Sequence, residues 1–227
     1  MVCDFHTHTF LSDGELLPIE LIRRAIVNGY QAIGLADHVS AGNVGLVVPA
    51  LVADCRLAEE YWDIRAIPGV ELTHLPPAAI AGVAAEARRL GAELIVVHGE
   101  TPVEPVAPGT NLAALRCPEV DLLAHPGPID LELARVAAEN GVFLEISTHR
   151  GHSLANGAVA CIARQAGALL LVNSDAHHPS EILTDEWQRR VGLCAGLTER
   201  EVEAAVRENT RRMLEKIEAR RARRCAT

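Results

Sequence analysis

Histidine is the residue type that sets this chain apart, with ten copies against two tryptophans, two tyrosines and two methionines. Imidazole and carboxylate groups together form the donor set that Zn, Mn and Fe ions take in proteins. Such side chains recur at separate points of the sequence: His6, His8, Asp13, His38, Glu71, His98, His125, Asp175 and His177. The first chemistry to consider is therefore a metal site assembled from distant segments.

Short apolar runs, separated by amphipathic stretches, are the elements that would have to position these residues. Continuous apolar character is typical of strands buried on both faces of a parallel sheet. Seven runs are expected to be strands: Val2–Phe5, Ala32–Ala36, Ile64–Val70, Leu94–Val97, Val120–Ala124, Val142–Ile146 and Ala168–Val172. Helix-like stretches lie near 17–28, 49–61, 77–91, 130–140 and 155–166. This alternation predicts βαβ units and an α/β fold.

Seven such units favour a closed barrel over an open sheet, although 227 residues are slightly fewer than an eight-stranded barrel usually has. A C-terminal helix is expected over 198–224, where Thr198 and Glu201 form a capping box. The basic cluster at its end is interpreted as a solvated helix terminus. Residues 99–118 form a Pro- and Gly-rich connection, of a length typical of functional or poorly ordered loops.

The ligand-type side chains fall at the ends of the predicted strands. Each apolar run has histidine, aspartate or glutamate just after it, and the sixth also contains Glu145. The carboxyl ends of barrel strands meet at one mouth, where burying such groups is costly unless they are paired or bind metal. One histidine after one strand is usually an ordinary hydrogen-bonded residue. The same placement at six or seven strand ends indicates one shared site.

Composition narrows the function classes. The 21 basic and 30 acidic residues give a net charge of −9, and aromatic residues make up only 3%, which argues against an extended nucleic-acid surface. The six cysteines form no CxxC pair and suggest free thiols in a reducing compartment. No apolar run approaches the roughly 20 residues of a membrane span, and no signal peptide is evident. A soluble cytoplasmic protein is expected, with its oligomeric state open.

The sequence resembles the PHP (polymerase and histidinol phosphatase) family of metal-dependent phosphoesterases. Each motif is weak alone, but together they follow the family's order over residues 4–177. They stand as Asp4-Phe5-His6-Thr7-His8 continuing to Gly14, Ala36-Asp37-His38, Gly69-Val70-Glu71, His98, Ala124-His125-Pro126 and Ser174-Asp175-Ala176-His177. The resemblance implies a distorted (β/α)7 TIM-like barrel of the PHP type, with residues 1–227 as a single domain.

The resemblance also implies two to three divalent ions, Zn, Mn or Fe, in the mouth of the barrel. By analogy, one ion is held by His6, His8, Glu71 and Asp175. A second is held by Asp13, His38 and His177, and a third by Glu71, His98 and His125, with Glu71 bridging. Glu71, Asp175 and His177 are the predicted catalytic residues. Spacing by itself supports only the shared mouth.

Hydrolysis of a phosphate monoester is the hypothesis that follows, with a metal-activated water attacking phosphorus in line. Arg150 is the expected grip on the phosphate, because its guanidinium is bidentate and permanently charged. Ser147, His149 and His152 lie in the same segment and are expected substrate contacts, and an imidazole there could protonate the leaving alkoxide. A solvated basic loop is the alternative interpretation of this segment.

Several polar residues near the strand ends have open roles. Asp4 and Asp37 lie beside ligand histidines and are expected either to orient an imidazole by accepting its second N–H or to be ordinary strand-end residues. His74, His178 and Glu100 are either bystanders or substrate contacts. The role of Glu145 is undecided.

The expected substrate is a small phosphorylated metabolite. Histidinol phosphate is the leading example, because the compact chain resembles the stand-alone histidinol-phosphatase branch of the family. A phosphodiesterase or exonuclease acting on nucleotides or short oligonucleotides is an alternative. A metal-dependent amidohydrolase is a second alternative; such enzymes also use HxH on a barrel, but usually in a longer chain. A non-catalytic barrel whose metals are structural is a third.

Overall fold

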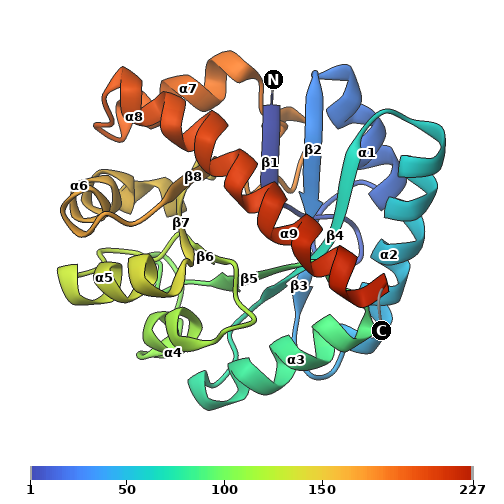
Figure 1. Ribbon diagram of the computed structural model, residues 1–227, viewed down its shortest axis with the longest axis horizontal. Helices are drawn as coiled ribbons and strands as arrows, with labels where there is room; N and C mark the ends of the chain where they lie inside the picture. Colours follow the sequence, from blue (N-terminus) through green and yellow to red (C-terminus); the bar gives the residue numbers. More distant parts are fainter. Residues whose placement is uncertain (1, 226–227) are drawn as a thin grey trace.

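The computed structural model of the protein describes residues 2–225, except for the side chains of 224 and 225. Seven parallel strands form a nearly closed barrel in chain order (Figure 1): β1 (Val2–Thr7), β2 (Tyr30–Leu35), β4 (Arg65–Leu72), β5 (Leu94–His98), β6 (Leu122–Ala124), β7 (Phe143–Ser147) and β8 (Leu170–Asn173). A two-residue strand, β3 (His38–Val39), pairs with β4. The predicted α/β fold with a distorted TIM-like barrel is confirmed.

Backbone contacts between the segment after β8 and β1 bring the two ends of the sheet together. The amide of Asp175 donates to the carbonyl of His6 at 2.8 Å, and the amide of His8 donates to the carbonyl of Ala176 at 2.9 Å. Several strands also run further than their apolar residues indicate. β1 continues through His6, β4 through Glu71 and β5 through His98, so these polar side chains belong to the strands instead of following them.

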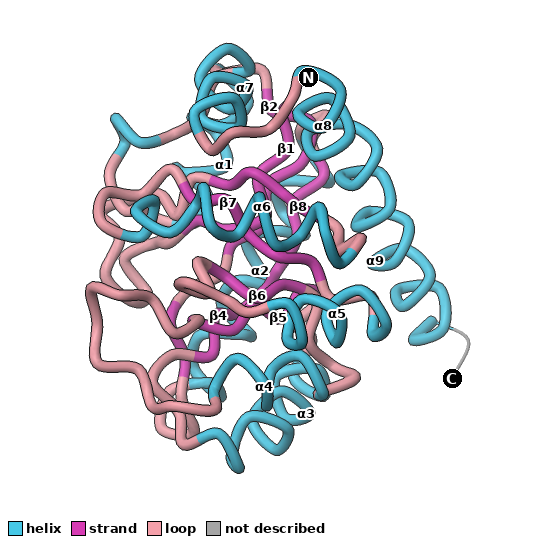
Figure 2. Tube along the Cα trace, turned by 90° about the vertical axis from the view of Figure 1, so that its left-hand side faces the viewer, coloured by secondary structure: helices cyan, strands magenta, loops and turns pink. Residues whose placement is uncertain are grey.

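The helices cover the outside of the barrel (Figure 2): α1 (Pro18–Val27), α2 (Val44–Tyr61), α3 (Ile80–Leu90), α4 (Thr110–Arg116), α5 (Leu131–Asn140), α6 (Asn156–Ala166) and α7 (Asp185–Cys194). Single 3₁₀ turns precede three of them: η1 (Pro77–Ala79), η2 (His152–Ala155) and η3 (Pro179–Glu181). Local side-chain chemistry determines where several of these helices begin. Pro18 lies in the first turn of α1, and the Asp130 side chain accepts from the amide of Leu133 to cap α5.

Three helical segments differ from the sequence prediction. α2 begins before Pro49, because Val44, Val47 and Val48 are buried and tertiary packing outweighs the missing proline N–H. α4 occupies part of the expected 99–118 connection, and α7 was not predicted.

The core has two layers. The outer layer lies between the strands and the surrounding helices. The inner layer fills the barrel and consists of strand residues together with Met213 and Ile217, both fully buried. Its strand members are Cys3, Phe5, Ala32, Ala36, Ile67, Leu94, Val96, Leu122, Ala124, Phe143 and Leu171.

The chain after α7 closes the amino-terminal end of the barrel. The C-terminal helix predicted over 198–224 is divided into α8 (Glu199–Glu203), a π turn (Ala204–Glu208) and α9 (Asn209–Cys225). Thr198 and Glu201 make the expected capping box. Figures 1 and 2 show α9 lying across one end of the barrel, while the long loops gather at the other.

Two residues of the predicted basic cluster, Arg220 and Arg221, are paired with the barrel, so their interpretation as part of a solvated helix end is wrong, whereas Arg223 is exposed and donates to the Ala219 carbonyl of its own helix. Arg220 and Lys216 lie 2.5 and 3.1 Å from Asp121 Oδ1, and Arg221 lies 2.9 Å from both Glu59 and Glu93. We call this the basal ion-pair network; it also includes Arg65 and Arg88. Acidic side chains of the barrel therefore surround these basic groups, in place of the solvent that the sequence suggested.

Cys3, Cys55, Cys117, Cys161 and Cys194 are free thiols, as predicted, and Cys225 lies outside the described side chains. Within the described residues, no helix combines the length and the apolar character that crossing a bilayer requires.

Candidate metal centre and adjoining cavity

The carboxyl ends of the strands bring the predicted ligands together in one mouth. Its centre is completely enclosed: His6 and Glu71 are 0% exposed. His6 Nε2 lies 3.4 Å from Glu71 Oε1 and 3.6 Å from Asp175 Oδ1. His8 Nε2 lies 3.1 Å from Asp175 Oδ1 and 3.8 Å from Glu71 Oε2. The four side chains of the first predicted set thus face one another.

The second set lies nearer the surface. Asp13 Oδ2 is 3.4 Å from His38 Nε2, and Asp13 Oδ1 is 3.3 Å from His177 Nε2. His8 joins this group, since its ring stacks on His177 with centroids 4.1 Å apart. Asp13 is 55% exposed, so this side of the mouth is open to solvent.

The third set is only partly assembled as predicted. His125 Nε2 lies 3.4 Å from Glu71 Oε1, but neither ring nitrogen of His98 lies within 4.0 Å of a Glu71 oxygen. His98 is grouped instead with His125 and His152, and its Nε2 lies 3.2 Å from Glu104 Oε2. The carboxylate beside His98 therefore comes from the 99–118 connection.

Unusual backbone geometry turns two of these side chains into the mouth. His125 has φ 25° and Asp175 has φ 56°, in a region that residues other than glycine rarely adopt and that is enriched at functional sites. The chain then turns tightly at Gly127. A Cβ there would lie 2.1 Å from the carbonyl oxygen of Glu100, so only glycine fits.

Partners on Nδ1 hold several rings with Nε2 directed into the mouth. Glu145 Oε1 lies 2.9 Å from His6 Nδ1, and the same carboxylate accepts from the Asn173 side chain and the His125 amide. The Nδ1 atoms of His38 and His177 contact the Thr73 hydroxyl and the Asp175 carbonyl. Such contacts fix ring orientation in metal sites, which gives Glu145 a role that the sequence left undecided.

Asp4 and Asp37 do not orient imidazoles, contrary to one of the two roles considered for them. The Asp4 carboxylate accepts from the amides of His6 and Ser174 and from the hydroxyl of Tyr30. Asp37 accepts from Thr9 and Ser12. Both carboxylates fix the backbone around the metal-ligand residues, whereas Glu145 orients the imidazole ring of His6.

The electrostatics of the mouth suit a cation. Burial lowers the pKa of His8 to about 4, so this ring is a neutral donor at pH 7. Burial disfavours a charge on Asp175, but His6, His8 and His125 around it together more than offset this and hold the pKa of the carboxyl below its usual range. The centre therefore combines ionised carboxylates with the neutral ring of His8, while the same carboxylates raise the pKa of His6 and His38 although burial opposes this.

Buried polar atoms without hydrogen bonds provide the direct test of whether a metal fits. Seven are found among residues 2–223, and five of them lie in the mouth: His6 Nε2, both ring nitrogens of His8, Glu71 Oε1 and His125 Nδ1. An unsatisfied buried polar atom costs about 1–3 kcal/mol, and native proteins keep such atoms few. Divalent cations coordinated by these nitrogen and oxygen atoms would satisfy most of them, so the residues present fit a metal centre.

The 147–152 segment adjoins this centre. His149 Nδ1 lies 3.0 Å from the carbonyl of Asp175, and the His152 ring stacks on His125 with centroids 4.0 Å apart. Ser147 is fully buried and accepts a hydrogen bond from the His149 amide at 3.1 Å. Arg150 is exposed, and within residues 2–223 its guanidinium has no ion-pair partner.

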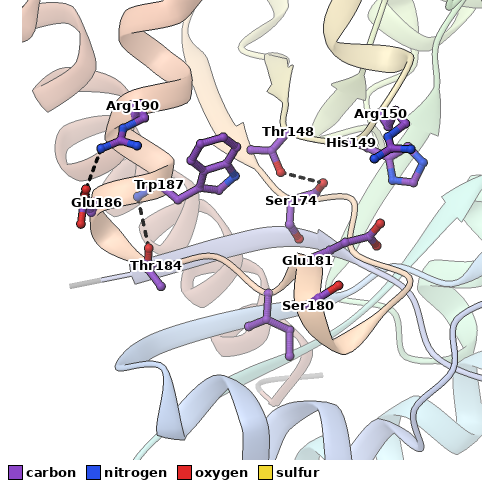
Figure 3. Close-up of a pocket in the computed structure, with 11 residues that line it drawn as sticks. Thr148, His149, Arg150, Ser174, Ser180, Glu181, Thr184, Glu186, Trp187 and Arg190 are labelled. Carbon is purple, nitrogen blue, oxygen red and sulfur yellow. Dashed lines mark hydrogen bonds and ion pairs between the residues drawn. The ribbon is translucent and has the colours of Figure 1, made fainter.

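A cavity of about 530 Å³ opens beside the mouth. Figure 3 shows Trp187 of α7 pointing toward Thr148, with His149 and Arg150 on the other side. The cavity shares a wall with the metal centre, because His149 contacts Asp175 and the Glu181 carboxylate accepts from the His177 amide at 2.8 Å. A ligand anchored at the metals could therefore extend into this space.

No family model matches the chain. The chain is 47% identical over 215 residues to the uncharacterized protein MJ1295 of Methanocaldococcus jannaschii, covering 94% of this chain and 99% of that protein. It is 30% identical over 203 residues to a protein of Shewanella halifaxensis named probable phosphatase, covering 77% of this chain and 76% of that one. The chain therefore belongs to the same family as this probable phosphatase.

Solved structures share the fold of this chain. A chain in the cryo-EM structure of archaeal ribonuclease P with mature tRNA superposes with a TM-score of 0.63 at 16% identity, over 95% of this chain and 89% of that one. A two-domain protein of Bacteroides vulgatus is described as containing a predicted PHP-like metal-dependent phosphoesterase. It superposes with a TM-score of 0.50 at 16% identity, over 92% of this chain and 62% of that one. At such identities the likeness concerns architecture alone.

The remaining polar residues near the strand ends have structural partners. Glu100 Oε1 accepts from the amides of Gly109 and Asn111 where α4 begins. His178 caps η3 and its Nε2 lies 3.4 Å from Glu15. The sequence analysis missed Glu104, because a glutamate in a Pro-rich connection gives no local sign of a partner across the barrel.

Proposed function

We propose that the protein is a metal-dependent phosphatase that hydrolyses a phosphate monoester at a trinuclear site. The observation that carries the proposal is the group of buried imidazole and carboxylate atoms left without hydrogen bonds at the mouth. The relative named probable phosphatase supports the same reaction class. The proposal treats residues 1–227 as one working domain.

Two to three divalent ions, Zn, Mn or Fe, would be held by the three ligand groups. The first group is His6, His8, Glu71 and Asp175; the second is Asp13, His38 and His177 with His8 adjacent; the third is built around His98 and His125. When bound, such cations neutralise phosphate oxygens and lower the pKa of water. Glu71 would be shared between ions in this proposal, since its oxygens lie 3.4 to 3.8 Å from Nε2 of His6, His8 and His125, while His38 Nδ1 contacts it directly at 2.7 Å.

The chain's own residues would bind and orient the ester. Arg150 lacks an ion-pair partner in the described structure, so its guanidinium is available to two phosphate oxygens. Burial lowers the pKa of His152 to about 4, which makes it a neutral donor instead of a source of protons. We therefore assign protonation of the leaving alkoxide to His149, which lies between the mouth and the cavity.

The cavity would take the organic part of the substrate. Its volume of about 530 Å³ lies within the range of about 300–1,000 Å³ usual for small-molecule sites. Histidinol phosphate is our leading candidate, because the indole of Trp187 could contact a planar ring and the carboxylate of Glu181 could attract an amine. Both side chains line the cavity on the side of η3 and α7.

A screen of the purified chain against phosphorylated metabolites and short oligonucleotides, with elemental analysis of the same sample, tests this proposal. We expect turnover of small monoesters, histidinol phosphate among them, that is lost on chelation and restored by Mn or Zn. A preference for oligonucleotides would favour the phosphodiesterase alternative. Metal binding without turnover on any ester would favour a non-catalytic barrel.

A further inference from the structure

Glu104 lies among three imidazoles that come from three different parts of the barrel. Its Oε2 is 2.9 Å from Nε2 of His74 and 3.2 Å from Nε2 of His98, and its Oε1 is 3.4 Å from Nε2 of His152. His74 follows β4, His98 ends β5 and His152 begins η2. One carboxylate from a connecting loop therefore meets the mouth on the side away from Asp13.

The loop holds Glu104 in this position by contacts on both sides. Before it, the Thr101 hydroxyl lies 2.8 Å from His152 Nδ1, and after it the Val106 amide donates to the Glu104 carbonyl at 2.9 Å. Pro102 and Pro105 flank it and restrict the backbone further. A side chain placed in this way has a defined position even though it is 37% exposed.

His98 has one ring nitrogen available for a cation. Its Nδ1 lies 3.2 Å from the carbonyl of Gly99 and can donate to it, which leaves Nε2 as the free donor atom. A neutral imidazole nitrogen has one lone pair in the ring plane and can serve one ion. The carboxylate within reach of that nitrogen is Glu104, at 3.2 Å, while Glu71 lies beyond 4.0 Å.

We propose that Glu104 is a ligand of the divalent cation that His98 and His125 hold in the proposed function, with His74 or His152 as a further imidazole. The atoms of His74, His98 and Glu104 lie within 4.8 Å of one another, and this mixed set suits Zn, Mn or Fe. The inference rests on the metal site of the proposed function and adds a ligand that the family resemblance does not supply. The loop that carries Glu104 thereby becomes part of the metal site.

Metal binding by the full chain tests the inference without an activity assay. We would strip the protein with a chelator and titrate it with Mn²⁺ or Zn²⁺ alone, following affinity by calorimetry and stoichiometry by elemental analysis. Glu104→Gln should weaken one binding step at least about tenfold, the minimum expected from losing a group that supports a metal site. Hydrogen exchange over residues 99–109 should slow on metal addition in the wild type but not in Glu104→Gln.

Glu15→Gln is the control, because Glu15 also pairs with a histidine, His178, at 3.4 Å and is at least as accessible as Glu104, yet lies outside the cluster. It should bind metal as the wild type does. Glu104→Asp keeps the charge but withdraws the oxygens by one methylene, so it should give an intermediate loss and replaces Glu104→Gln if that variant does not fold without metal.

The outcomes separate the two proposals. Unchanged affinity, stoichiometry and loop exchange in Glu104→Gln, or in Glu104→Asp where it is used instead, overturn the assignment of Glu104 while leaving the metal-dependent function intact. A wild type that binds no cation overturns the proposed metal site itself. Loss of the same binding step in both Glu104→Gln and Glu15→Gln would also count against a specific ligand role.

Discussion

The two ends of the barrel treat charge in opposite ways. At the amino-terminal end, the buried carboxylate of Asp121 contacts Arg88, Lys216 and Arg220 at 2.5 to 3.1 Å. At the carboxyl end, imidazole nitrogens and an oxygen of Glu71 are buried without hydrogen bonds. The base pairs its charges within the chain, although Arg88 Nε there also lacks a hydrogen bond, whereas the mouth leaves several donor atoms for something that the chain does not supply.

One short strand makes the contrast plain. β6 has three residues, with Asp121 just before it and His125 just after it. Although burial opposes it, Arg88 and its neighbours hold the pKa of Asp121 below its usual range, so this carboxylate is a charged anchor. His125 keeps an unpaired Nδ1. Two polar residues four positions apart thus serve stability and ligand binding respectively.

The largest effect is expected from Asp175→Asn in the mouth. The carboxylate lies within 3.7 Å of His6, His8 and His125, and its charge is needed to hold a cation. Phosphatase activity should fall by at least about a thousandfold, in line with removal of a group acting on the transition state. Bound metal, measured by elemental analysis, should fall as well. Wild-type activity or metal content would contradict the assignment.

Asp121→Asn at the base should leave the chemistry intact and reduce stability instead. Removing one member of a buried ion-pair group leaves the others unpaired and costs about 3 kcal/mol. Urea unfolding of the metal-free forms measures this loss, and kcat per folded molecule should match the wild type. The comparison between the ends would fail if Asp175→Asn lost as much metal-free stability as Asp121→Asn.

Added metal should stabilise the chain through the mouth alone. A ligand at a hundred times its dissociation constant adds about 2.7 kcal/mol to the free energy of unfolding. Mn²⁺ or Zn²⁺ should raise Tm by the same amount in the wild type and in Asp121→Asn, and by much less in Asp175→Asn. Equal shifts in all three proteins would mean that metal binds elsewhere.

The smallest effect is expected from Arg150→Ala at the rim. Its guanidinium is exposed and outside the metal ligands, so its loss should remove phosphate binding in the ground and transition states alike. KM should rise about tenfold, or roughly 1.4 kcal/mol, with kcat nearly unchanged. Steady-state kinetics on a small monoester measure this change in KM. An unchanged KM would mean that Arg150 is a solvated surface residue that does not bind the phosphate.

The strands and the types of the site residues could be predicted from the sequence, because each depends on local pattern. Leu94–Val97 is continuously apolar and His98 follows it, and the structure has β5 at that place. The partners could not be predicted. Glu145 contacts His6 across 139 residues and Arg220 contacts Asp121 across 99, and such pairs depend on strand order and register, which local pattern does not encode.

The local sequence pattern also gave wrong predictions where contacts between distant segments determine the surroundings of a side chain. The basic residues of 218–224 read as a solvated helix end, yet Arg220 and Arg221 face acids on the barrel. Glu104 was passed over because its loop has no periodicity from which to infer a direction. Both errors concern side chains whose partners lie on other elements.

α9 carries a consequence for the order of events during synthesis. It follows all seven strands in the chain, yet it supplies Met213 and Ile217 to the inside of the barrel. A nascent chain emerging from the ribosome can align its strands before α9 has been synthesised. The apolar interior of the barrel then stays accessible to chaperones or to neighbouring chains. Slow translation of the 209–225 segment should therefore favour aggregation more than the same delay between two strands.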